Sequence, residues 1–293
     1  MAAVSHPEGS RAGAIWRYMR RNPKLLGGLG LILLIVLVGF VGRLFVNLDD
    51  ARPISAMPEL PPSWEHPFGT DGVGRDLFTV LVAAIPLALE VGLLAGAVGL
   101  GIGILLGFIA GFQGGQIDNI IRGVVDTLLT VPGLVVLITI TATIKEVLSV
   151  EVMALVVASL AWMWPTRTIR SQVLTLRERA YVKMAKLNGM SNMEIIWREL
   201  LPNLLPYLGA SYVGAVSSAI LASIGLEALG LGPQNEPTIG MTIYWAISFT
   251  SLIRGIWWWW LPPIAFVVIL FIGLFLVSAG LDEAANPRLR RAA

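Results

Sequence analysis

Few side chains in this chain could do chemistry on a substrate. The 293 residues include two histidines, His6 and His66, and no cysteine. Neither histidine is spaced from another ligand-type residue as a zinc site requires, so we expect no metal site. No lysine follows a glycine, so the Gly-Lys pair of a phosphate-binding loop is absent. The sequence therefore predicts no catalytic residue, and the chain is not expected to be an enzyme.

One acidic residue has entirely apolar surroundings. Glu90 lies in a long apolar run, and an ionisable group inside a membrane is costly to bury unpaired, so it is a candidate for function. Two interpretations remain open: Glu90 lines a transport pathway, or it has a structural or interfacial role. Tyr244 and Trp245, in a later connection, are candidates for the same pathway. The tryptophans at 257–260 indicate an aromatic belt at the membrane surface, or a stacking surface for a sugar or peptide.

A charged segment, residues 176–203, lies between two apolar regions and reads LRERAYVKMAKLNGMSNMEIIWRELLPN. Its pattern predicts a helix through about Asn188, a turn at Gly189 and a second short helix. Glycine is favoured where a helix ends in a left-handed residue. Ser191 and Glu194 form the Ser-x-x-Glu pattern of a helix start. Pro202 stands at the start of the next apolar helix, where a missing amide costs least.

The faces of this charged segment mix apolar and basic side chains. Such a surface suits anionic lipid, or the groove of a partner protein. Two short capped helices with a fixed turn are more than lipid binding requires. The sequence therefore favours docking to a partner protein.

The composition is that of an integral membrane protein. Hydrophobic residues make up 56% of the chain and charged residues 14%, against about 25% charged in soluble domains. A bilayer core of about 30 Å requires about 20 apolar residues in a helix. We predict an all-α protein with six transmembrane helices, at residues 25–46, 77–112, 120–144, 152–169, 204–229 and 260–281. The net charge of +2 gives no reason to expect nucleic acid as a partner.

The distribution of lysine and arginine predicts the orientation in the bilayer, because cytoplasmic connections are enriched in both. With the N-terminus in the cytoplasm, the inside segments hold sixteen of the 21 lysines and arginines. Both termini and the charged segment are therefore expected to be cytoplasmic. The expected order is an N-terminal segment 1–24, a first helix 25–46, an extracytoplasmic loop 47–76, a transmembrane domain 77–282 and a cytoplasmic tail 283–293.

Four glycines recur at every fourth position of the second predicted span: Gly99, Gly103, Gly107 and Gly111. They share one face of a helix, where small residues let a second helix approach closely. Packing within the chain is the simpler interpretation. A subunit interface or a sliding surface is the alternative.

The charged segment resembles the EAA loop of the inner-membrane permeases of binding-protein-dependent ABC importers. Lys183, Met184 and Ala185 occupy the Glu-Ala-Ala triplet, Gly189 the glycine, and Leu201 with Pro202 the Leu-Pro pair. Lys183 and Met184 depart from the motif, so an acidic contact cannot be carried over. Other blocks are similar to the C-type permeases of dipeptide, oligopeptide and nickel importers: 66–71 with 74–76, 114–118 with Arg122 and Asp126, 229–232 and 286–290.

The resemblance implies a type I ABC importer permease fold in a prokaryotic cytoplasmic membrane. It implies three kinds of partner besides lipid: a second homologous permease, two ATPase subunits that bind ATP and Mg, and an extracytoplasmic solute-binding protein. This chain itself would bind no cofactor. The residues expected to couple to the ATPase are Arg179, Tyr181, Lys183, Met184, Ala185, Lys186, Gly189, Ser191, Leu201 and Pro202.

The sequence leaves the transported solute open. Peptides are the first expectation, with β-linked oligosaccharides and nickel as alternatives on the same machinery. A stand-alone channel or carrier would be expected to show internal repeats, broken helices or more intramembrane charge. None of these is visible in the sequence, and the permease is preferred.

Overall fold

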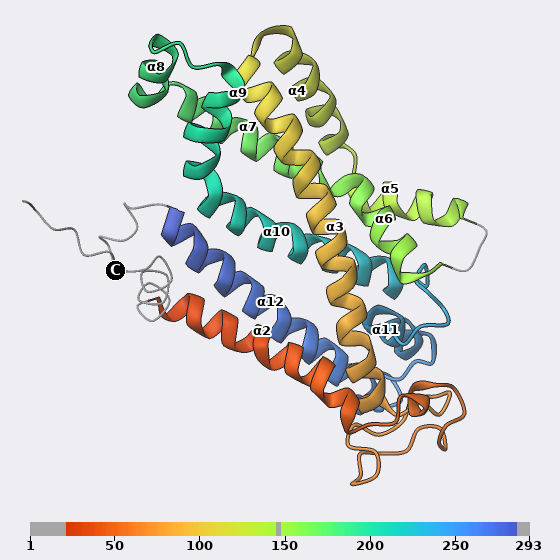
Figure 1. Cartoon of the computed structure of the whole chain (residues 1–293). Helices are drawn as coiled ribbons and strands as arrows, with labels where there is room; N and C mark the ends of the chain where they lie inside the picture. The colour runs from red at the N-terminus through yellow and green to blue at the C-terminus, as the bar shows by residue number, and fades with distance from the viewer. Residues whose placement is uncertain (1–21, 145–147, 286–293) are drawn as a thin grey trace, which may run out of the picture.

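The structure is a computed structural model that describes residues 22–144 and 148–285. In these ranges helices are joined by turns and irregular loops. Figure 1 shows the long helix α3 crossing the molecule, with α2 and α12 side by side on one flank and α4, α5 and α6 on the other, while α7 crosses α3 toward α8. The helices are α2 (Pro23–Val41), α3 (Leu77–Gln113), α4 (Gly115–Thr130), α5 (Gly133–Thr143), α6 (Val150–Ala161), α7 (Met163–Arg177), α8 (Ala180–Leu187), α9 (Asn192–Ile195), α10 (Leu201–Ala228), α11 (Ile239–Ser248) and α12 (Trp257–Ala285).

The described helices account for up to six membrane spans. Four are long and apolar enough to cross a bilayer: Pro23–Leu44, Leu77–Gln113, Asn192–Ala228 and Trp257–Glu283. Two bent pairs, α4 with α5 and α6 with α7, bring the number to six if each pair is one span. The prediction of an all-α protein with several membrane spans is confirmed.

The helix predicted over 120–144 is interrupted. The chain instead forms α4 and α5, which meet at an angle of 82°. Proline disfavours the helical region for the residue before it, and Val131, just before Pro132, is extended at φ −82° and ψ 130°. The sharp turn is thus a consequence of one proline, and it aims α5 away from the line of α4.

The span predicted at 152–169 is also broken. Helices α6 and α7 differ in direction by 40°, and the break lies at Trp162. Helix α7 then continues to Arg177, beyond the predicted end. Span limits shift elsewhere as well: α2 ends at Val41 and passes into a 3-10 turn (Gly42–Leu44), α10 begins at Leu201, and α12 begins at Trp257.

The four-residue glycine stripe of α3 packs against a four-residue stripe of the α6–α7 pair. A Cβ on Gly99, Gly103, Gly107 or Gly111 would lie 2.6, 2.5, 3.0 or 2.8 Å from the Cβ atoms of Ala161, Pro165, Ile169 and Val173, in that order. Both stripes repeat every fourth residue, so each glycine faces one side chain of the partner stripe. The structure therefore uses these glycines for close packing within the chain.

Candidate functional site

Helix α8 is the short helix of the charged segment, and it is separated from α7 by a turn. The single helix predicted from residue 176 to about Asn188 is broken, because α7 ends at Arg177 and Arg179 is extended, at φ −69° and ψ 148°. The Arg179 N–H donates to the Leu176 carbonyl at 3.0 Å, which closes the turn. The break lets α8 turn back and bury one face against the rest of the chain.

The buried face of α8 consists of Val182 and Ala185, with 0% and 6% of their surface exposed. Both belong to a core cluster with Ile195 and Leu200 from the segment that follows, and with Phe112 at the end of α3. The Lys186 Nζ lies 5.1 Å from the centre of the Phe112 ring, a cation–π distance. Ala185 therefore anchors α8 inside the chain and presents no surface to a partner.

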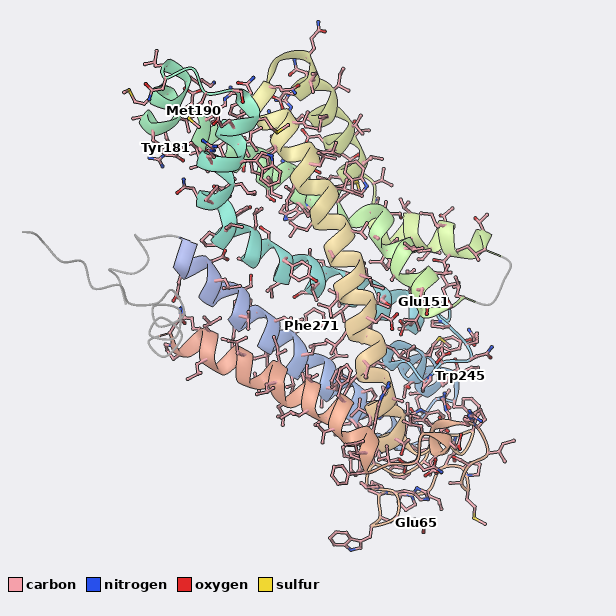
Figure 2. All side chains as sticks on the ribbon, in the orientation of Figure 1. Glu65, Glu151, Tyr181, Met190, Trp245 and Phe271 are labelled. Carbon is pink, nitrogen blue, oxygen red and sulfur yellow. The ribbon has the colours of Figure 1, made fainter. Side chains whose placement is uncertain are left out.

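The opposite face of α8 is exposed, and most of the predicted docking residues lie on it or at the start of the helix. Five of the predicted docking residues are exposed here: Arg179, Tyr181, Lys183, Met184 and Lys186. Leu187, which follows them, is 81% exposed. Figure 2 places Tyr181 and Met190 at the end of the molecule where α3 meets α4. Apolar tips among basic groups form a surface suited to a groove in another protein.

Gly189 ends α8 as the sequence predicts. Its φ is +81°, and its N–H donates to the Lys186 carbonyl at 3.0 Å. The Met190 N–H donates to the Ala185 carbonyl at 3.1 Å. These two bonds make a Schellman motif, which requires a left-handed residue at the glycine position. The direction in which the chain leaves α8 is therefore fixed by the backbone of one residue.

Ser191 caps the next helix, because its Oγ accepts the Glu194 N–H at 3.2 Å. Glu194 does not supply the second half of the expected capping box, since its carboxylate lies 2.8 Å from Arg198 Nη1. The predicted second short helix is not separate. Helix α9 runs through a π-helical turn, η3 (Ile196–Leu200), directly into α10. Leu201, partly buried, and Pro202, exposed, stand in the first turn of α10.

Lys183 stands where the EAA pattern has an acid, and its charge is met within the chain. Its Nζ lies 3.2 Å from Glu178 Oε2, and Arg177 Nε lies 3.5 Å from Glu178 Oε1. The hydrogen bond from Lys183 lowers the pKa of Glu178, with further lowering from the nearby positive charges. An ionised carboxylate is thus present beside α8, supplied from the turn before it.

The structure joins two of the three predicted pathway residues, Tyr244 and Trp245, by a ring contact, and a pathway that includes Glu90 stays a prediction. Glu90 is half-buried on α3 and has no hydrogen bond or ion pair within the part of the chain that the structure describes. Tyr244 and Trp245 lie on α11, a helix that the sequence did not predict inside the connection 230–259. Their rings meet edge to face at 5.0 Å, and Trp245 lies 6.2 Å from the Phe249 ring. Figure 2 shows Trp245 beside the end of the molecule that lies opposite α8.

Glu227 is a buried acid that the sequence interpretation missed. It lies at the end of α10 and is 5% exposed. The Ser223 hydroxyl donates to Oε1 at 2.6 Å, and the Gly240 N–H in the first turn of α11 donates to Oε2 at 3.0 Å. A carboxylate is favourable at a helix N-terminus. Glu227 therefore fastens α11 to α10, and the available sequence signal was an acid four residues after a serine at the end of an apolar run.

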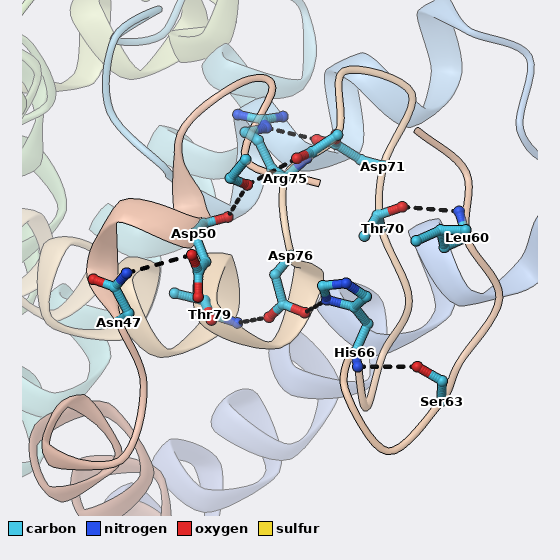
Figure 3. Close-up of polar contacts among 12 residues, drawn as sticks. Asn47, Asp50, Leu60, Ser63, His66, Thr70, Asp71, Arg75, Asp76 and Thr79 are labelled. Carbon is cyan, nitrogen blue, oxygen red and sulfur yellow. Dashed lines mark hydrogen bonds and ion pairs between the residues drawn. The ribbon is translucent and has the colours of Figure 1, made fainter. Parts of the chain in front are cut away.

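The loop before α3 is held together by buried polar side chains, drawn in Figure 3. Asp76 caps α3 by accepting the Thr79 N–H at 2.7 Å, and its other oxygen lies 2.9 Å from His66 Nδ1. Asp71, fully buried, pairs with Arg75. Thr70 Oγ1 accepts the Leu60 N–H at 2.8 Å. The block 66–76 thus builds a compact loop around the start of α3.

Comparison with protein families matches most of this architecture to one family. The model described as "Binding-protein-dependent transport system inner membrane component" matches residues 103–291. The match begins within α3 and includes the glycines 103, 107 and 111, α8, Gly189 and α12.

Individual relatives match over nearly the whole chain. The dipeptide transport system permease protein DppC of Bacillus subtilis (strain 168) is 30% identical over 289 residues, which cover 99% of this chain and 89% of the relative. The oligopeptide transport system permease protein OppC of the same strain is 28% identical over 93% of this chain and 88% of its own length. OppC of Mycobacterium bovis (strain ATCC BAA-935 / AF2122/97) is 28% identical over 96% of this chain and 95% of its own length.

Proposed function

This chain belongs to the family of binding-protein-dependent transport system inner membrane components and is a permease subunit of such an importer, and we propose that it forms half of a pathway for peptides. We further propose that α8 couples this pathway to an ATPase. Such a permease is a multi-pass inner-membrane protein and lacks catalytic activity of its own. The other half of the pathway would come from a second, homologous permease. An extracytoplasmic binding protein would deliver the solute.

The observation that carries the coupling role is the two-sided construction of α8. Its inner face is buried through Val182 and Ala185, while its outer face presents basic and apolar side chains to solvent. A partner that pushes on the outer face therefore moves the cluster beneath it. The Gly189 turn and the unbroken run from Asn192 to Ala228 then pass the movement to α10.

The peptide substrate is supported by the relatives. The names of the dipeptide and oligopeptide permeases state what those importers carry. ATP and magnesium would be bound by two cytoplasmic ATPase subunits, and α8 would lie on the cytoplasmic face with both termini. Rigid-body movement of the ATPases would switch the bundle between inward and outward access.

A crosslinking experiment tests the docking role of α8. The chain has no cysteine, so a single introduced thiol gives an unambiguous site. We expect the Ser191→Cys variant, in the assembled importer with peptide uptake intact, to crosslink to the ATPase through a short thiol-directed reagent. The matched control is Ser63→Cys, an exposed serine in the loop before α3, which should give no ATPase crosslink. Crosslinks from Ser191→Cys only to lipid or to the other permease would contradict ATPase docking.

A further inference from the structure

An open pocket of about 270 Å³ lies between α4 and α7. It is separate from the exposed face of α8 and from Glu90, Tyr244 and Trp245. Helix α4 packs loosely, since Val125 alone among its described residues is buried. The pocket opens beside this helix. The lining residues are Ile121, Arg122, Val125, Asp126, Thr166, Arg167 and Arg170.

The pocket contains guanidinium groups with unused donors. Arg170 is satisfied by Asp118 through a bidentate pair, with Nη2 2.6 Å from Oδ2. Arg122 Nε and Arg167 Nε each lie 3.8 Å from Asp126, which is beyond hydrogen-bond distance. The guanidinium groups of Arg122 and Arg167 make no hydrogen bond within residues 22–144 and 148–285. Two guanidiniums with five N–H donors each therefore share one carboxylate.

The charge of this cluster is not balanced. Three arginines face two carboxylates, Asp118 and Asp126, so one positive charge remains. The side chains of Arg122 and Arg167 are each 57% exposed, so both forks can reach an incoming group. A tetrahedral oxyanion such as phosphate accepts from two arginine forks at once.

The position of the pocket along α3 places it at the level of lipid headgroups. Helix α3 begins at Leu77. A hydrocarbon core takes about 20 helical residues, so a helix that enters the core at Leu77 leaves it at about residue 100. Gly103 packs against Thr166 and Gly107 against Arg170, just beyond that level. Helices α4 and α7 approach the end of the molecule where α8 lies (Figure 1), and the pocket that their residues line is therefore nearer to that end.

The outer surface of α4 next to the pocket is apolar. Ile120, Val124 and Leu128 are exposed there, and their spacing of four residues puts them on one face of α4. A ligand that contacts the pocket with a phosphate could lay a hydrocarbon chain along this face. A free phosphate ion would use the arginines alone.

We propose that Arg122 and Arg167 bind the phosphate of an anionic phospholipid headgroup in the leaflet on the α8 side. Basic pockets between transmembrane helices at a membrane surface attract anionic headgroups. Asp126 holds the two arginines in place while the site is empty and competes with the lipid. The site is independent of the transported solute and of ATPase docking.

Native mass spectrometry of the purified, assembled importer tests the site. The probes are phosphatidylglycerol, phosphatidylcholine and inorganic phosphate, added to delipidated complex. We expect one retained phosphatidylglycerol for each copy of this chain, and a loss of affinity of about ten-fold or more in the Arg122→Gln/Arg167→Gln variant. The control Arg52→Gln/Arg198→Gln removes the same charge from two side chains that are 79% and 72% exposed, and should retain the lipid.

The Asp126→Asn variant should change lipid affinity in the opposite direction from the arginine variant, which a purely structural cluster would not produce. Removing the competing carboxylate should increase phosphatidylglycerol affinity, while inorganic phosphate should displace the lipid in none of the variants. Equal retention of phosphatidylglycerol by the Arg122→Gln/Arg167→Gln variant would overturn the proposal. Displacement by inorganic phosphate would assign the site to the free ion instead. Retention of phosphatidylglycerol by the isolated chain but not by the assembled importer would show that a partner subunit covers the pocket, and would overturn the proposal.

Discussion

At the scale of single residues, the charge at Lys183 alters the surface that α8 would present to the proposed ATPase. The EAA pattern has an acid at this position, whereas here the acid is Glu178, five residues earlier and 3.2 Å from the lysine ammonium. Both side chains are exposed, so the pair contributes little to folding. Its effect is on the pattern of charge that the docking surface presents.

The Lys183→Glu substitution tests this charge pattern. It places two carboxylates side by side, so we expect the ratio of peptide transported to ATP hydrolysed to fall, by less than about five-fold at an exposed site and more at low salt. The Glu178→Lys/Lys183→Glu double variant restores an opposite-charge pair and should recover the ratio. The ratio is measured in vesicles that contain the reconstituted importer with its ATPase subunits facing the inside. A higher ratio in Lys183→Glu would show that the partner requires the acid at position 183 itself.

Gly189 is the residue at which backbone conformation limits substitution. A side chain there would meet no atom within 4 Å, but φ is +81°, a conformation that costs an L-residue about 1–2 kcal/mol and a β-branched residue more. We expect Gly189→Val to insert in the membrane normally and to lose peptide uptake by about five-fold or more, because α8 must re-orient. Gly189→Asn is the control, since asparagine tolerates this conformation. Equal uptake by the two variants would disprove a role for the turn.

At the scale of elements, the stripes of α3 and of the α6–α7 pair fit each other at four-residue intervals. The fit is specific to the glycines that face the partner stripe. Gly103 lies against the Pro165 side chain and the Thr166 backbone, whereas nothing lies within 4 Å of a Cβ on Gly101. Gly103 therefore has no room for a side chain, whereas Gly101, two residues earlier on the same helix, has open space beside it.

This contrast gives a matched pair of alanine variants. Gly103→Ala should lower the melting temperature of the assembled complex, because overpacking a tight contact costs about 1–3 kcal/mol. Gly101→Ala should leave it unchanged or raise it, since alanine is the better helix former by about 0.5–1 kcal/mol. Fluorescence-detected size exclusion after heating measures both. Equal destabilisation by the two variants would show that the stripe is not closely packed.

The elements also show where the sequence was sufficient. The Ser191 cap and the Gly189 turn were predicted because each depends on local hydrogen bonds and backbone conformation. The break after α7, helix α11 and the role of Glu227 depend on contacts between distant segments, which one sequence does not reveal. The 82° bend was readable from Pro132 in principle, but the apolar run on both sides of the proline suggested a continuous span.

At the scale of the whole molecule, the chain has two ends with different chemistry. The end with α8 carries exposed basic side chains and the arginine pocket. The other end carries the loop built on Asp71, Arg75 and Asp76, and the aromatic cluster of α11 and α12. All-helical architecture and the presence of several spans followed from composition, because bilayer thickness fixes helix length. The pairing of helices did not, since apolar faces look alike in lipid.

Besides α3, a second element that reaches both ends follows directly on α8. The continuous helix from Asn192 to Ala228 has 37 residues, which is about 55 Å measured along its axis at 1.5 Å per residue, and Figure 1 shows that it bends between α9 and α10. One end follows the Gly189 turn, and the other holds Glu227, which grips the first turn of α11. Such a helix acts as a bent lever: a rotation of about 5° at the α8 end would carry the far end through at most about 5 Å. A small stroke applied to α8 would thus be enlarged into a displacement of α11, without any intervening loop to absorb it.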